Sequence, residues 1–131
     1  MNVLGEGHIE FDGEQRIYRI IRRDYEGAPR FFIGYNHGFP FISDEVPEKF
    51  REPMIFHELY EFEKLKDKSG RCVASLKEEL KLLSPHDIRE YIEFRKGVLE
   101  ELKRYLRRNE PKSEFLPELK KSIEFLAGFN L

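Results

Sequence analysis

The sequence predicts an α+β domain, in which a small antiparallel sheet of three to four strands precedes about four helices packed on one sheet face. Residues 1–44 are rich in β-branched and aromatic residues and are divided by turn signals, as strands are. From residue 45 onward, apolar side chains recur at helical spacing. The chain has no internal repeat and no linker-like segment, so its 131 residues are expected to form one domain, 1–131.

The first 44 residues contain four candidate strands. These strands are expected at 8–12, 15–23, 30–35 and 39–43, separated by turns at Asp12-Gly13, Glu26 to Pro29 and Asn36 to Gly38. Pro40 lacks a backbone N–H, so the last strand is expected at a sheet edge or to be irregular. The short connections favour an antiparallel meander with one face that needs a cover.

The rest of the chain predicts helices with recognisable start signals. Ser43 or Asp44 is expected to cap a short helical turn over 46–51, before Pro53 begins the main helix. The expected helices are 53–66, 71–83, 84–108 and a final helix delimited by Pro111 and Pro117. In the helix 84–108, Ser84 is the expected N-cap and Pro85 occupies the first helical position.

Composition excludes several classes of protein. Charged residues make up 37% of the chain, but the formal net charge is only −2, which argues against a dedicated nucleic-acid binder. A lone cysteine, Cys72, excludes an intramolecular disulfide and fits a reducing compartment. No apolar run approaches the ~18 residues of a membrane span and no leader opens the chain, so a cytoplasmic protein without membrane contact is expected. Abundant Glu, Lys and Arg with a single Gln are typical of proteins from high temperature.

The helix at 53–66 carries the strongest functional signal. At ~100° per residue, its apolar side chains surround most of the circumference, which predicts a buried helix. His57, Glu58 and Glu61 lie within that apolar belt, where such groups are costly unless they are paired, protonated or bound to metal. His57 and Glu61 are four residues apart and therefore share a helix face.

The stretch from His57 to Glu61 resembles the His-Glu-x-x-His helix motif of zincin metallopeptidases, with glutamate in place of the second histidine. The resemblance implies zinc as cofactor, His57 as the first metal ligand and Glu61 as the second. It also implies that Glu58 acts as general base toward the metal-bound water. The order of elements is similar to a minimal zincin too, and the gluzincin branch takes its third ligand from a glutamate on the following helix. On the helix 71–83, Glu79 borders the apolar stripe at Leu76, so Glu79 is the expected third ligand.

His57, Glu58 and Glu61 are also compatible with a role that involves no metal. The trio could be a polar cluster paired with arginines such as Arg22, Arg23, Arg51 or Arg95, or it could be solvated. Cys72 is expected to be a small buried hydrophobe. His37 and His86 are weaker ligand candidates, and His8 is expected on the surface.

Three functional hypotheses follow from the sequence. A metal-dependent hydrolase would cleave peptide bonds, with the strand 39–43 aligning an extended substrate through main-chain pairing. A non-catalytic protein would instead bind a peptide or protein partner through surface aromatic residues, notably Phe31, Phe32, Phe39 and Phe41. A homodimer could form through the helix 84–108 or through Phe125 and Phe129.

Overall fold

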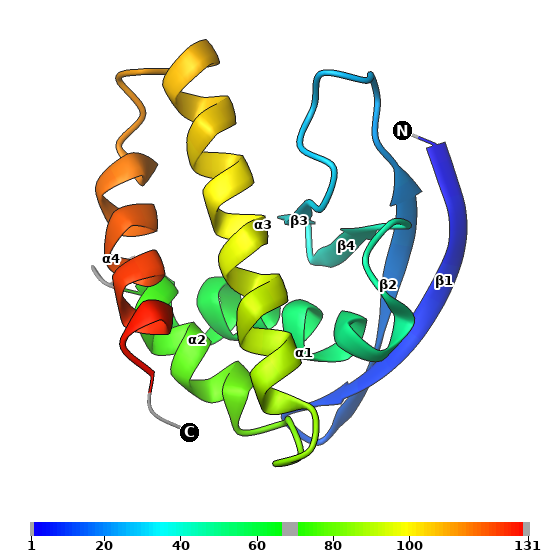
Figure 1. Ribbon diagram of the computed structural model, residues 1–131. Coiled ribbons are helices and arrows are strands. Elements are labelled where there is room, and N and C mark those ends of the chain that lie inside the picture. The colour runs from blue at the N-terminus through cyan, green and yellow to red at the C-terminus, as the bar shows by residue number, and fades with distance from the viewer. Residues whose placement is uncertain (1, 67–70, 130–131) are drawn as a thin grey trace.

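The computed structural model describes residues 2–66 and 71–129 and confirms the α+β class. Its elements are β1 (Asn2–Phe11), β2 (Glu14–Arg22), β3 (Ile33–Asn36), β4 (Phe39–Ser43), α1 (Glu48–Leu59), the π-helix η1 (Tyr60–Leu65), α2 (Arg71–Leu80), α3 (Ile88–Asn109) and α4 (Phe115–Ala127). Figure 1 shows the helices gathered on one side of the sheet, with β1 forming the opposite, outer edge. No helix in the described part of the chain is long and apolar enough to cross a membrane.

The four strands form a mixed sheet in the order β1-β2-β4-β3. β2 pairs with β4 in parallel, with Ile20 opposite Ile42, so the expected all-antiparallel meander is wrong at this pair. β4 is therefore an interior strand, and the two edge strands are β1 and β3, so the prediction from Pro40 that the strand 39–43 lies at an edge is wrong. Pairing between β2 and β4 begins at Phe41, so Pro40 lies beyond that ladder and its missing N–H removes no hydrogen bond there.

All three predicted turns are confirmed: the Ala28 N–H donates to the Tyr25 carbonyl at 3.1 Å in the turn around residues 26–29, and the other two are tight hairpin turns. Asp12 and Gly13 have φ values of 55° and 81°, and His37 and Gly38 have values of 50° and 84°. Two consecutive left-handed residues are what a two-residue hairpin loop requires, because that geometry matches the twist of the flanking strands. These turns connect β1 to β2 and β3 to β4.

The main helix begins earlier than predicted. α1 starts at Glu48 and runs through Pro53, so the expected separate turn before Pro53 is wrong. Proline removes a single intrahelical hydrogen bond, and Arg51 supports the start of the helix by donating to the backbone oxygens of Val46 and Asp44, at 3.1 and 3.0 Å. After Leu59 the helix continues as η1, which has π-helical geometry, and π-helical turns often occur at functional sites.

The remaining helix boundaries differ by a few residues from those predicted. α3 begins at Ile88, because Ser84 and Asp87 form a preceding turn in which the Ser84 hydroxyl accepts from the Asp87 N–H at 3.3 Å. α2 ends at Leu80, and α4 contains Pro117 in its first turn. The predicted break at residues 68–70 lies outside the described residues.

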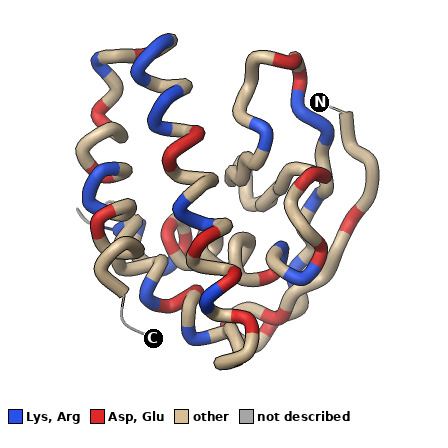
Figure 2. Tube along the Cα trace, viewed as in Figure 1, with Lys and Arg blue, Asp and Glu red and all other residues tan. Residues whose placement is uncertain are grey.

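The core lies between the sheet and α1, with the other helices outside α1. Met54, Ile55 and Leu59 of α1 are fully buried in one cluster with Ile42 of β4 and Leu99 of α3. Figure 2 shows charges of both signs distributed along the outer helices, in keeping with the balanced composition. The burial of α1 confirms that His57, Glu58 and Glu61 lie inside the molecule.

Candidate metal centre

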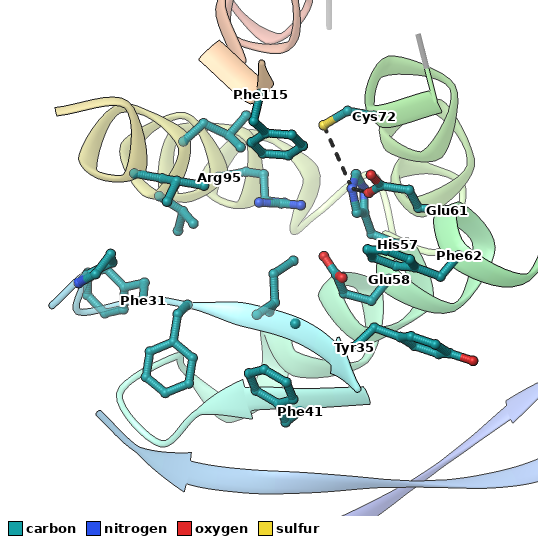
Figure 3. Close-up of a pocket in the computed structure, with 17 residues that line it drawn as sticks. Phe31, Tyr35, Phe41, His57, Glu58, Glu61, Phe62, Cys72, Arg95 and Phe115 are labelled. Atoms are coloured by element: carbon teal, nitrogen blue, oxygen red, sulfur yellow. Dashed lines mark hydrogen bonds and ion pairs between the residues drawn. The ribbon is translucent and has the colours of Figure 1, made fainter. Parts of the chain in front are cut away.

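The candidate site lies at the junction of α1 and η1, beside the first turn of α2. His57 comes from the last turn of α1, Glu61 from the first turn of η1 and Cys72 from the start of α2. All three side chains are buried, with residue exposures of 2%. Their ligand-type atoms all lie within 4.8 Å of one another (Figure 3).

These three side chains are of the types that bind zinc, and they lie close together. Nε2 of His57 lies 2.9 Å from Oε2 of Glu61 and 3.9 Å from Sγ of Cys72. Imidazole, carboxylate and thiolate all bind zinc, and tetrahedral ligands at ~2.0–2.3 Å from the metal lie roughly 3.5 Å from one another. Small side-chain movements would therefore bring the three donors to a common ion. This ligand set differs from the zincin pattern, because a cysteine from α2 takes part.

Glu79, the expected third ligand, lies on the other side of the imidazole. Its Oε1 is 2.6 Å from Nδ1 of His57, a close ion-pair contact without the geometry of a hydrogen bond. The same carboxylate accepts from Arg95 at 3.0 and 3.3 Å and from the Tyr91 hydroxyl. Glu79 is thus fully engaged away from Nε2. The structure brings His57 and Glu61 together as expected, but it puts Cys72 in the position that we predicted for Glu79.

The position of Glu79 suits a supporting role behind a metal ligand. Metal-binding histidines commonly place their second ring nitrogen against a carboxylate, which orients the ring and makes the other nitrogen a better ligand. Here Arg95 and Tyr91 hold the carboxylate, and the carboxylate lies against Nδ1. Nε2 consequently points toward Glu61 and Cys72.

The imidazole of His57 lies between two carboxylates, which favour its protonated form. Burial alone would lower the pKa of His57, but Glu79, Cys72 and Glu61 together raise it well above its usual value. Burial also opposes ionisation of Glu79, yet Arg95 and His57 hold the pKa of that carboxyl below its usual value. Binding of a metal at Nε2 would therefore have to release a proton.

Two arginines pair with the cluster, and only one of them was expected. Arg95 is fully buried, but its partner is Glu79 and not one of the three residues, His57, Glu58 and Glu61, that it was expected to pair with. Arg71 lies 3.2 Å from Oε1 of Glu61 and is about a quarter exposed. Arg23 and Arg51 make their contacts elsewhere, with Glu45 and with backbone oxygens. The Arg71 contact leaves Oε2 of Glu61 directed at the imidazole.

Glu58 is the least compensated acid of the group. No hydrogen bond or ion pair to its carboxyl is found within residues 2–66 and 71–129, although the residue is only 7% exposed. Burial raises the pKa of Glu58 to about 7, and the nearby charge of His57 only partly offsets that effect. Figure 3 shows the carboxyl group directed into open space beside the imidazole.

That space is a cavity of about 350 Å³ between the sheet edge and the helices. His57, Glu58, Glu61 and Cys72 form one part of its wall, and Arg95 reaches it from α3. Phe41 of β4 crosses Gly34 of β3 so closely that any side chain there would clash with its ring, which is a reason for glycine at this position. The candidate ligands therefore lie at the wall of a cavity large enough for a small organic group.

Sequence reasoning missed that Cys72 lies beside His57 and Glu61, although a signal was present. Cys72 and Glu79 are seven residues apart, close to two helical turns, and therefore share the face of α2 that meets His57. From the sequence alone, Cys72 is expected to be a small buried hydrophobic residue. The sequence does not show how close its thiol lies to α1. His8, His37 and His86 are all exposed, and none of them belongs to the cluster.

No protein-family model, curated protein or solved structure matches this chain.

Proposed function

We propose that this protein is a zinc-dependent hydrolase in which His57, Glu61 and Cys72 bind the metal and Glu58 is the general base. One observation carries the proposal: three side chains of ligand type lie within 4.8 Å of one another at the wall of a cavity that Glu58 also lines. Three protein ligands leave a fourth position for water or substrate, as in catalytic zinc sites.

Each residue has a role that its position supports. Zinc, when bound, would polarise a substrate carbonyl and make an attacking water more acidic. Glu58 follows His57 directly and faces the cavity, where its carboxylate can take a proton from that water and deliver it to the leaving group. Glu79 keeps the imidazole oriented, and Arg95 and Tyr91 keep Glu79 in place.

The proposed substrate is a peptide or a related amide. The expected aligning strand, 39–43, is interior, and the edge strand beside it is β3. Gly34 and Tyr35 of β3 line the cavity, so the main chain of an extended substrate could pair with this strand instead. The aligning role expected for β4 therefore passes to β3.

The alternative of a non-catalytic interaction module rests on the surface aromatic residues. Phe31, Phe32 and Phe41 line the cavity and are partly buried, whereas Phe39 is 46% exposed. Most of the expected aromatic patch is therefore the wall of an internal site. This arrangement favours a small ligand or substrate over a flat protein interface.

Metal analysis tests the proposed centre. We expect about one zinc ion per purified chain, and zinc added to chelator-treated protein should raise the melting temperature by several degrees. Cys72→Ala and Glu61→Gln should each abolish that rise. Glu78→Gln is the matched control, because Glu78 is a more exposed acid on the same helix and pairs with Lys81. Metal-free protein that gains no stability from zinc would contradict the proposal.

A second experiment separates a catalytic from a structural metal. Glu58→Gln should retain zinc but lose hydrolysis of a fluorogenic peptide library by about 100-fold or more, as expected for loss of a general base. Zinc-loaded wild-type protein that cleaves nothing in the library would leave a metal-binding protein without hydrolase activity.

A further inference from the structure

The cavity beside the candidate metal centre has two chemically different parts. One part is polar and consists of the four site residues together with Arg95. The other part is apolar and draws on four segments: the residues before and within the β3–β4 hairpin, Phe62 of η1, one face of α3, and the first residue of α4. The side chains that decide its shape are Phe31, Phe41, Val98, Leu99, Leu102 and Phe115.

The apolar part offers no partner for a charged group. Apart from the site residues, Arg95 is the only ionisable cation or acid among the residues that line the cavity in the described chain. Two of its nitrogens, Nε and Nη2, are engaged by Glu79. A lysine or aspartate side chain placed against the phenylalanines would lose its hydration without compensation, which is strongly unfavourable.

Arg95 nevertheless leaves one of its three nitrogens, Nη1, for a ligand. No partner for its Nη1 is found among the described residues, and the guanidinium, although only 1% exposed, lines the cavity. Figure 3 shows the guanidinium directed across the open space toward the His57 and Glu58 side. A ligand oxygen between Arg95 and the proposed metal position would accept a charge-assisted hydrogen bond.

The cavity size limits what can enter. Its volume of about 350 Å³ is at the lower end of the range of ~300–1,000 Å³ that is typical of small-molecule sites. That space suits one amino-acid-sized group and excludes several consecutive bulky residues.

We propose that the cavity binds one large apolar group, aromatic or branched aliphatic, attached to a carbonyl or carboxylate oxygen that Arg95 recognises. The proposal rests on the proposed function in one respect: in the hydrolase, this group is the residue beside the cleaved amide bond. The substrate class is thus amides and short peptides that carry phenylalanine, leucine or a similar residue at that position.

Binding of small probes tests the proposal without requiring catalysis. The probes are N-acetyl-phenylalanine amide, the corresponding alanine and lysine amides, and toluene, which lacks the oxygen. Calorimetry with Glu58→Gln protein, in the presence and in the absence of zinc, should show that the phenylalanine amide binds at least about 10-fold more tightly than the alanine amide, because a full aromatic side chain is buried. The lysine amide and toluene should bind more weakly than the phenylalanine amide.

Two variants locate the probe. Leu102→Trp should fill the apolar part and weaken binding of the phenylalanine amide by about 10-fold or more, whereas the same change at the exposed Leu82 should leave it unaltered. Phe115→Ala should enlarge the cavity and shift preference toward a naphthylalanine amide. This second variant decides the matter if Leu102→Trp does not fold.

The outcomes separate this proposal from the hydrolase itself. Selective binding of the phenylalanine amide by a protein that takes up no zinc would support the ligand class and overturn the hydrolase. A zinc-loaded protein that cleaves peptides with no preference for an apolar residue, or binds all three amides equally, would overturn the ligand class and leave the hydrolase intact.

Discussion

Two glutamates contact the same imidazole from opposite sides, and their surroundings differ. Glu79 has a full set of partners: Arg95, Tyr91 and His57, all buried. Glu61 has His57 and the partly exposed Arg71, and its neighbours Cys72 and Glu58 face a cavity. A carboxylate with all its hydrogen-bond capacity engaged stabilises the fold, whereas a carboxylate with spare capacity can bind a ligand. The Nδ1 side of His57 is therefore filled by mutually paired side chains, and the Nε2 side is where the proposed chemistry would take place.

Removing the charge of Glu79 should have the largest effect on stability. Glu79→Gln would leave Arg95 and the imidazolium of His57 buried without their shared anion, so we expect a loss of about 3–5 kcal/mol in the free energy of unfolding. Denaturant unfolding of metal-free protein measures it. Glu78→Gln, which affects a surface pair with Lys81, should change stability by less than about 1 kcal/mol. Equal effects of the two changes would show that Glu79 contributes no more to the stability of the fold than a surface acid does.

The raised pKa of Glu58 should make the free energy of unfolding decrease as pH rises. The pKa of Glu58 is about 7 in the folded protein and near 4.5 when it is unfolded, so the folded state holds this proton more tightly. The stability that this group contributes is fully present below its unfolded pKa and is lost as pH rises through about 7.

Glu58→Gln should therefore become more stable relative to wild type between pH 5 and pH 8, by up to roughly 3 kcal/mol in chelator-treated protein. Unfolding by denaturant across that pH range gives the difference. The control Glu52→Gln changes an exposed acid on the same helix and should show no comparable trend. A difference independent of pH would place Glu58 on the structural side of the site.

Cys72 should matter little to the metal-free fold. Cys72→Ala removes one buried sulfur that has only a weak contact with His57, so we expect a loss of about 1 kcal/mol. The same variant should lose its response to zinc, which would sharpen the contrast with Glu79. A loss as large as that of Glu79→Gln would show that the thiol is a structural element.

The ion pair between Arg16 and Glu63 serves as an exposed reference for the buried pairs around Glu79, and we expect its loss to have the smallest effect on stability. Arg16 donates to both oxygens of Glu63 at 2.6 Å, but both side chains are more than a fifth exposed. A double-mutant cycle with Arg16→Gln and Glu63→Gln should give a coupling energy below about 1 kcal/mol, because solvent screens the charges. A coupling as large as that around Glu79 would mean that burial does not distinguish the two carboxylate environments.

The parts of the fold that depend on short-range periodicity could be predicted. The helical repeat placed His57 and Glu61 on one buried face and turned Glu79 inward, and the Asp12-Gly13 pair marked a hairpin. These features depend on residues a few positions apart, which a single sequence displays directly.

The parts that depend on pairing between distant segments could not be predicted. The parallel contact between β2 and β4 joins strands about 20 residues apart, and the sequence contains no mark of it. The sequence also does not show that Glu79 contacts Nδ1 of His57 or that Cys72 approaches Nε2. Both contacts depend on how α2 packs on α1. No glycine or proline near Tyr60 indicates in the sequence that the helix changes to a π-helix there.

The strand order has a practical consequence for spectroscopy. β1 lies three places from β3, at the sheet edge opposite the cavity (Figure 1). His8 on β1 is exposed. The only native thiol, Cys72, is buried. A cysteine introduced in place of His8 would therefore accept a fluorophore selectively in the folded protein and report global unfolding from a position that neither metal nor ligand touches.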